Sequence, residues 1–145
     1  MPAELRIDAV GRIVFTRLFG VVTDDDFLSL TRFVVDSPEM RPGFSELCDL
    51  RDSTRVEISA DALRRNLAMT EPLDRHPSRR SARIAVVAPD DAAFGVARMY
   101  ESMRADSPVG VRAFRDVDDA RDWLGLPRGD EDAPPSPGDS SRRVV

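Results

Sequence analysis

The chain has 145 residues, of which 41% are hydrophobic and 32% are charged, proportions that suit one soluble globular domain with its own core. Its 26 acidic and 21 basic residues give a net charge of −5, which disfavours a nucleic-acid-binding protein. The single cysteine excludes an internal disulfide, and no apolar run approaches the ~20 residues that span a bilayer. The chain does not start with the basic-then-apolar pattern of a signal peptide, so we expect a cytoplasmic protein.

Two short runs of alternating apolar and polar residues, at 5–10 and 13–19, follow one another around a glycine. This pattern predicts an antiparallel hairpin with one solvated face, in which Gly20 closes the second strand. Thr23 precedes three aspartates and an apolar stripe with helical spacing. We therefore predict that Thr23 is the N-cap of a helix that ends before Pro38.

The middle of the chain predicts a strand, a loop, a second helix and a second loop. The strand covers 44–50, although its alternation is imperfect, and a loop follows through Asp52-Ser53-Thr54. Ser59 is the expected N-cap of the helix. The polar segment 71–81 contains two prolines, so we predict that it is a loop.

The sharpest local signal is the unbroken apolar run 84–88, which leads through a proline to Asp90 and a helical pattern. A strand with a continuous apolar run is usually covered on both faces, as a central parallel strand is. Asp90 fits the N-cap of the helix. A strand at 111–114 and an acidic-capped helix at 116–124 complete the pattern, with Trp123 on the inward side of that helix.

The predicted element order is ββαβαβαβα, which indicates an α/β fold. We expect a mixed, mostly parallel sheet with an antiparallel N-terminal hairpin strand and helices packed on the sheet. Residues 1–126 form this domain. Residues 127–145 are acidic and rich in proline and serine, with almost no apolar surface, so we expect a disordered tail.

Four phrases along the chain carry a resemblance to a known superfamily. They are Gly11-Arg12-Ile13 leading to Gly20-Val21-Val22-Thr23; Leu47-Cys48-Asp49-Leu50-Arg51; Ile84-Ala85-Val86-Val87 through Phe94-Gly95-Val96-Ala97-Arg98; and Phe114-Arg115-Asp116 with Ala120 and Trp123-Leu124. In this order they resemble the STAS-like superfamily, in particular the bacterial branch that is similar to anti-sigma-factor antagonists and to the CRAL-TRIO lipid-transfer fold. The resemblance implies a fold more than an activity, because most members of this branch have no known role.

The resemblance also implies a candidate switch. In the better-understood antagonists, a partner kinase phosphorylates a serine in the loop that enters the second helix, and this controls partner binding. Ser53 lies near the matching place, beside Arg51, Asp52 and Arg55, and Ser59 is the alternative because it is nearest the helix start. The antagonists carry a glycine shortly after this serine, which this chain lacks.

The other nucleophilic or basic residues have structural interpretations. His76, the only histidine, lies in the arginine-rich run 75–80 and is expected to be a solvated loop residue. With Arg83, this run forms a basic patch that could hold a phosphate or an acidic partner. Cys48 is expected to fill core space as a small apolar residue.

Three acids follow the third strand, at the edge where open α/β sheets place their ligands: Asp49, Asp52 and Glu57. They suggest a metal site, but no recognisable ligand spacing supports it, so turn and capping roles are favoured. We therefore expect neither a metal nor a cofactor. Phe94-Gly95 is interpreted as a point of close packing between a helix and the sheet.

Three functions stay open at this stage. The leading one is a non-catalytic regulatory domain that docks a protein partner, because the chain shows no catalytic set. The second is a small-molecule or lipid-binding module, which a cavity among Phe27, Leu30, Phe33, Met99 and Met103 would favour. The third is an enzyme, which only the acid cluster supports. A protein partner is expected and a homodimer is left open, with no nucleic acid and no membrane span.

Overall fold

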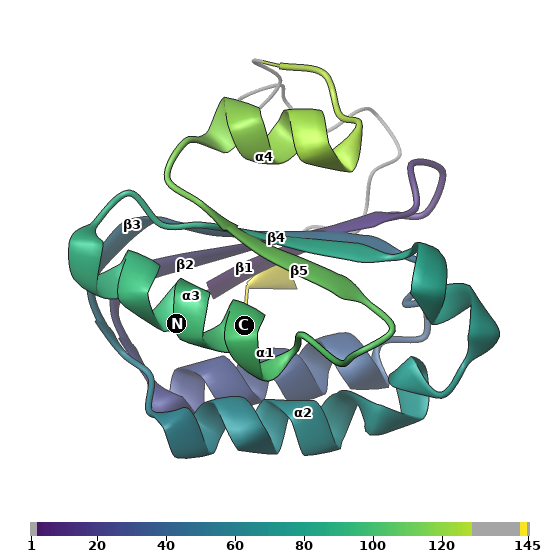
Figure 1. The fold of residues 1–145 in the computed structure, drawn as a ribbon, viewed down its shortest axis with the longest axis horizontal. Coiled ribbons are helices and arrows are strands. Elements are labelled where there is room, and N and C mark those ends of the chain that lie inside the picture. The colour runs from purple at the N-terminus through teal and green to yellow at the C-terminus, as the bar shows by residue number, and fades with distance from the viewer. Residues whose placement is uncertain (1–2, 129–142, 145) are drawn as a thin grey trace.

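The computed structural model describes residues 3–128 and 143–144, which Figure 1 shows as a coloured ribbon. The strands are β1 (Ala3–Asp8), β2 (Ile13–Thr23), β3 (Ser45–Glu57), β4 (Arg83–Val87), β5 (Gly110–Phe114) and β6 (Arg143–Val144). The helices are α1 (Asp24–Asp36), α2 (Ala60–Asp74), α3 (Asp91–Met103), α4 (Val117–Leu124) and the short 3-10 helix η1 (Pro77–Ser81). The strands form one sheet in the order β5-β4-β3-β2-β1-β6.

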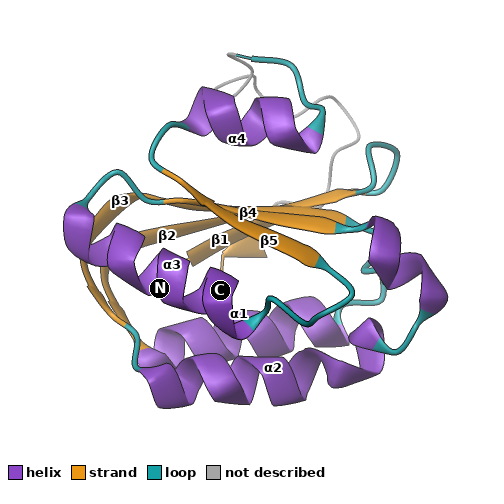
Figure 2. Cartoon of the chain, in the orientation of Figure 1, coloured by secondary structure: helices purple, strands orange, loops and turns teal. Residues whose placement is uncertain are grey.

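The sheet is mixed and mostly parallel. Strands β2, β3, β4 and β5 are parallel to one another, whereas β1 is antiparallel to β2. Helices α1, α2 and α3 lie on one face of the sheet and α4 lies on the other (Figures 1 and 2). The predicted α/β fold class and the antiparallel N-terminal strand are confirmed. No helix in the described residues is long and apolar enough to cross a membrane.

The segment that the sequence assigns to a tail is only partly described. Residues 129–142 and 145 lie outside the described residues. Arg143 and Val144 form β6, which pairs antiparallel with β1. The disorder expected for the tail, and with it the domain boundary at residue 126, stays a prediction.

Two apolar clusters fill the two faces of the sheet. The larger one packs beneath α1, α2 and α3 and includes Leu5, Leu18, Leu63 and Ala97, each almost fully buried. The smaller one lies under α4 and centres on Ala120 and the ring pair described below. Because helices cover both faces of the sheet here, most side chains of β4 and of the first half of β3, up to Leu50, are enclosed on either side, whereas the second half of β3 is largely exposed.

The predicted helix starts are confirmed. The hydroxyl of Thr23 accepts a hydrogen bond from the backbone N of Asp26 (3.4 Å), and the carboxylate of Asp26 accepts one from the backbone N of Thr23 (2.9 Å). This reciprocal pair satisfies two amides that the first turn leaves without partners. The side chains of Ser59 and Asp90 cap α2 and α3 by accepting a hydrogen bond from the backbone N three residues on, without the reciprocal bond.

Two predicted boundaries around the second and third strands are wrong. Gly20 does not end its strand, since β2 continues through it to Thr23. The segment predicted as the loop Asp52-Ser53-Thr54 belongs to β3. Gly20 has φ +59° and lies between two register irregularities of the β2–β3 ladder, so the glycine forms a bulge that lets pairing continue.

The predicted loop 71–81 is also wrong. Helix α2 runs past Pro72 to Asp74, and η1 covers residues 77–81. Pro72 lies in the last turn of α2 and removes one backbone donor there, and the helix continues for only two residues beyond it. Tertiary hydrogen bonds to Asp74 keep this turn helical.

Trp123 provides a test of the smaller cluster. Its ring lies 5.6 Å from that of Phe114, and the guanidinium of Arg83 lies 5.4 Å from the ring centroid. Trp123→Ala should lower the free energy of unfolding by about 3 kcal/mol in a denaturant titration, because a mostly buried aromatic ring is lost. Val10→Ala is the control, since Val10 is 96% exposed and its truncation should change stability by less than about 0.5 kcal/mol. Equal effects of the two changes would contradict the packing role.

Candidate functional site

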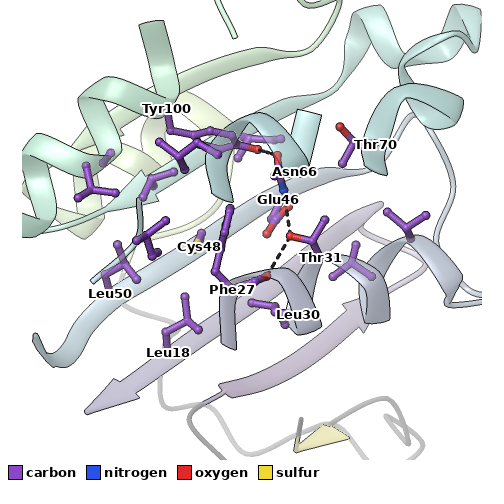
Figure 3. Close-up of a pocket in the computed structure, with 18 of the residues that line it drawn as sticks. Leu18, Phe27, Leu30, Thr31, Glu46, Cys48, Leu50, Asn66, Thr70 and Tyr100 are labelled. Carbon is purple, nitrogen blue, oxygen red and sulfur yellow. Dashed lines mark hydrogen bonds between the residues drawn. The ribbon is translucent and has the colours of Figure 1, made fainter. Parts of the chain in front are cut away.

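A cavity of about 70 Å³ lies between the sheet and helices α1, α2 and α3. It is several times larger than the ~10–15 Å³ that one water molecule requires, and it is not sealed from solvent. Most of its lining is apolar, with polar side chains gathered toward one part (Figure 3). The lining residues include Leu18, Phe27, Leu30, Thr31, Glu46, Cys48, Leu50, Asn66, Thr70, Arg79, Val96, Ala97 and Tyr100.

Alternate residues of β3 form the floor of the cavity: Glu46, Cys48 and Leu50. Glu46 and Cys48 lie in the middle of the sheet, yet both retain some accessible surface, because they line the cavity. The Thr16 hydroxyl on β2 donates a hydrogen bond to Glu46 Oε1 (3.1 Å). This leaves Oε2 of Glu46 as the oxygen that can carry a proton or contact a ligand.

Burial controls the protonation of these groups. The pKa of Glu46 is raised from 4.5, because desolvation outweighs the hydrogen bond from Thr16 and the attraction of Arg79 and Arg104. Burial, together with the nearby Glu46 carboxyl, raises the pKa of the Cys48 thiol to about 12. Cys48 is therefore a neutral thiol and a poor nucleophile at neutral pH.

Helix α2 supplies the polar wall through Asn66. Its side-chain nitrogen donates to the hydroxyl of Thr31 (2.9 Å), and its side-chain oxygen accepts from the hydroxyl of Tyr100 (2.9 Å). Figure 3 shows these bonds as a bridge from α1 through α2 to α3. Burial raises the pKa of Tyr100 to about 12, so its hydroxyl remains a donor.

Two buried arginines flank the polar wall. Arg104 Nη2 donates to Asn66 Oδ1 (3.0 Å) and to Thr70 Oγ1 (2.5 Å), and Arg104 Nη1 donates to Asp74 Oδ2 (3.1 Å). Arg79 Nε donates to Asp74 Oδ1 (2.9 Å). Arg79 and Arg104 are 3% and 1% exposed, so one carboxylate balances two enclosed guanidinium groups. Arginines are almost never buried so fully unless they are paired.

Of the two candidate switch residues, Ser53 lies in a strand instead of a loop, and Ser59 lies at the start of the second helix. Ser53 lies inside β3, opposite Gly20, and its hydroxyl donates to the carbonyl oxygen of Leu50 (2.5 Å). Ser59 occupies the entrance of α2, where its hydroxyl donates to Asp24 Oδ2 (2.7 Å). These hydrogen bonds from Ser59 lower the pKa of Asp24. A phosphate on Ser59 would meet that carboxylate.

Each of the three acids after the third strand pairs with an arginine of its own. Asp49 is bound by Arg51, with Nη2 and Oδ2 2.8 Å apart. The other two pairs are Asp52 with Arg17 and Glu57 with Arg55. Within the part of the chain that the structure describes, no group of three or more His, Cys, Asp or Glu side chains could hold a metal ion.

The basic run 75–80 is not one solvated patch. Arg75 and Arg80 are exposed, but Arg79 is buried in the cavity wall, because η1 turns it toward Asp74. His76 is exposed and caps η1, and its Nδ1 accepts a hydrogen bond from the backbone N of Ser78 (3.2 Å).

The cavity only partly matches the residues proposed for it. Phe27 and Leu30 line it, whereas Phe33, Met99 and Met103 pack against the larger apolar cluster outside its lining. The interpretation of Phe94-Gly95 as a close-packing point is wrong, because Gly95 is exposed and a Cβ there would contact nothing within 4 Å.

Sequence reasoning missed the polar residues of the cavity. Asn66 and Thr70 could have been found from their spacing, because they lie at helical intervals from Leu63 on the buried side of α2. The imperfect alternation of β3 was a signal for Glu46, since a strand covered on both faces has no solvated side for a carboxylate. Nothing in the local sequence marks Arg104, which follows the last turn of α3.

Comparisons with models of protein families and with curated proteins found no match. Among solved structures, the chain is similar to an uncharacterized protein of the DUF3478 family with a SpoIIAA-like fold, from Shewanella loihica PV-4. The TM-score is 0.49 and the identity 18%, over 77% of this chain and 83% of that chain. A similarity at this level carries no inference about superfamily or function. The CRAL-TRIO part of the resemblance stays a prediction.

Glu46→Gln tests the burial of the carboxyl. An acid whose folded-state pKa is raised holds its proton longer in the folded protein, so stability falls as pH rises from the ordinary pKa of 4.5 up to the raised pKa, and it levels off above that. Glutamine has no such ionisation and still accepts a hydrogen bond from Thr16. The stability of Glu46→Gln relative to wild type should therefore increase as pH rises above 4.5, until Glu46 ionises in the folded protein, in denaturant titrations.

Glu57→Gln is the matched control, because Glu57 is an exposed glutamate on the same strand. Its stability difference from wild type should change little over the same pH range. A difference for Glu46→Gln that is equally flat would show that the carboxyl is not desolvated.

Proposed function

We propose that this protein is a non-catalytic binding module for a small, largely apolar molecule with one polar group. The single observation that carries this proposal is the cavity beneath α1, α2 and α3. Leu18, Leu50 and Phe27 supply apolar surface, while Asn66 and Glu46 supply hydrogen-bonding groups. A mostly apolar pocket with a few convergent polar groups is the usual form of a small-molecule site.

The size of the cavity limits the ligand. An apolar cavity of ~150 Å³ accommodates benzene, so the ~70 Å³ here suits a shorter or thinner group. Because the cavity is partly open, the rest of a ligand can extend through its mouth. A linear chain of about six carbons, as in hexanol or hexanoate, is larger than benzene, so only part of it can lie inside the cavity while the rest extends through the mouth; such chains are suitable probes.

Substitutions of Cys48 test the proposal at one position. Cys48→Met adds volume to the floor of the cavity, and its flexible side chain fits irregular space with little strain. It should weaken the binding of hexanol and hexanoate by at least about tenfold in calorimetric titrations, an effect of about 1.4 kcal/mol.

Cys48→Ala is the matched control, because it removes the same thiol but enlarges the cavity. It should bind both probes at least as tightly as wild type. Wild-type protein that binds neither probe, or two variants that bind equally, would contradict a ligand site in this cavity.

A second proposal keeps the role of a regulatory domain that docks a protein partner. Its specific support is Val21, which is 50% exposed and lies opposite Arg55 in the ladder, next to the Gly20–Ser53 pair. An exposed apolar side chain beside a candidate phosphorylation site suits a docking surface. The cytoplasmic location expected from the sequence belongs to the same proposal.

Phosphopeptide mapping of the protein from its native host tests the regulatory role. Phosphate on Ser53 or Ser59, together with partner binding that differs between Ser53→Asp and Ser53→Ala, is the expected result. Unmodified serines and identical binding by the two variants would leave both serines with structural roles alone.

A further inference from the structure

The charges around the cavity do not balance when Glu46 is neutral. Arg79 and Arg104 contribute two positive charges, and Asp74 contributes one negative charge that both arginines share. All three side chains are enclosed, with exposures of 3%, 0% and 15%. An enclosed excess charge is costly in a poorly solvated site, so this region favours one further anion.

Arg79 has hydrogen-bonding capacity toward the cavity. Its Nε is bound to Asp74, and its Nη1 lies 3.5 Å from the carbonyl oxygen of Pro42. Within residues 3–128, its Nη2 has no hydrogen-bond partner. This atom is not among the fully buried side-chain atoms that lack a partner, so it keeps some accessible surface. A guanidinium with a free edge is the protein group best suited to bind a carboxylate.

Glu46 lines the same cavity without an ion pair to either arginine. Its Oε1 accepts from Thr16, and its Oε2 has no partner among the described residues. In its neutral form, this carboxyl can donate a hydrogen bond to an anionic oxygen. The rise in the pKa of Glu46 on burial supports the neutral form. The neutral Cys48 thiol and Tyr100 hydroxyl are the other titratable groups that line the cavity.

We propose that the ligand is a monocarboxylate with a short apolar body. Its carboxylate accepts hydrogen bonds from Arg79 Nη2 and from the Glu46 carboxyl, and its apolar body lies against Leu50 and Leu18. Bound in this way, the ligand supplies the missing negative charge, so that two anions face two guanidinium groups. This inference rests on the proposed ligand-binding function and names the chemical class of the ligand.

Matched head groups test the inference in the wild-type protein, which avoids variants that fail to fold. Hexanoate, hexanamide and hexanol have the same apolar body, and only hexanoate is an anion. In calorimetric titrations at about pH 6.5, hexanoate should bind at least about tenfold more tightly than either neutral probe, because its hydrogen bonds are charge-assisted. Neutral probes that bind as tightly as hexanoate would overturn the inference and leave the proposed function standing. Failure of all three probes to bind would overturn both.

The pH dependence of hexanoate binding tests the role of Glu46. As pH rises through the raised pKa of Glu46, its ionisation places a second carboxylate beside the ligand, so the affinity of wild type should fall at least about tenfold. Glu46→Gln keeps a neutral donor at every pH, so its affinity for hexanoate should change less than about twofold over the same range. Glu57→Gln should follow wild type. Affinities of wild type and Glu46→Gln that fall in parallel would overturn the role of Glu46.

Discussion

The carboxylate of Asp74 joins the end of α2 to η1, which follows it in sequence, and to the end of α3, 30 positions along the chain. It accepts hydrogen bonds from Arg79, which follows α2 in η1, and from Arg104, at the end of α3. Arg104 in turn binds Asn66 and Thr70 on the inner side of α2. Together with the hydrogen bond from Tyr100 to Asn66, these bonds hold the ends of α2 and α3 against each other. The polar wall of the cavity, the final turn of α2 and the burial of Arg79 all depend on this one acceptor.

Such a cluster is not an efficient way to stabilise a fold. Removing one member of a buried ion pair typically costs ~3–5 kcal/mol, but replacing the whole group with well-packed apolar residues is often neutral or favourable. Polar residues on the inward stripe of α2 leave an open space where leucines would have filled it. The cluster therefore makes more sense as part of a binding site than as a source of stability.

The sequence predicted the fold better than the site, and the residues explain why. Helix starts at Thr23, Ser59 and Asp90 depend on neighbours within a few positions, so local patterns were sufficient. The continuation of β2 and β3 depends on pairing across the ladder, which no local pattern records. The cavity depends on contacts such as Arg104 with Thr70, 34 positions apart in the chain, and such contacts exist only after folding.

Leu50 contacts both the cavity of the first proposed function and the candidate phosphorylation site of the second. Its side chain lines the cavity, while its carbonyl oxygen accepts the hydrogen bond from the Ser53 hydroxyl. A phosphate on Ser53 would remove that donor, and a ligand in the cavity would contact the side chain of the same residue. If both events occur, linkage requires their effects to be reciprocal: a ligand that disfavours phosphorylation must itself be weakened by the phosphate to the same degree. A ligand with equal affinity for the two forms would leave them independent. Leu50 thus provides a direct physical route by which a binding module of this fold can also be a regulatory one.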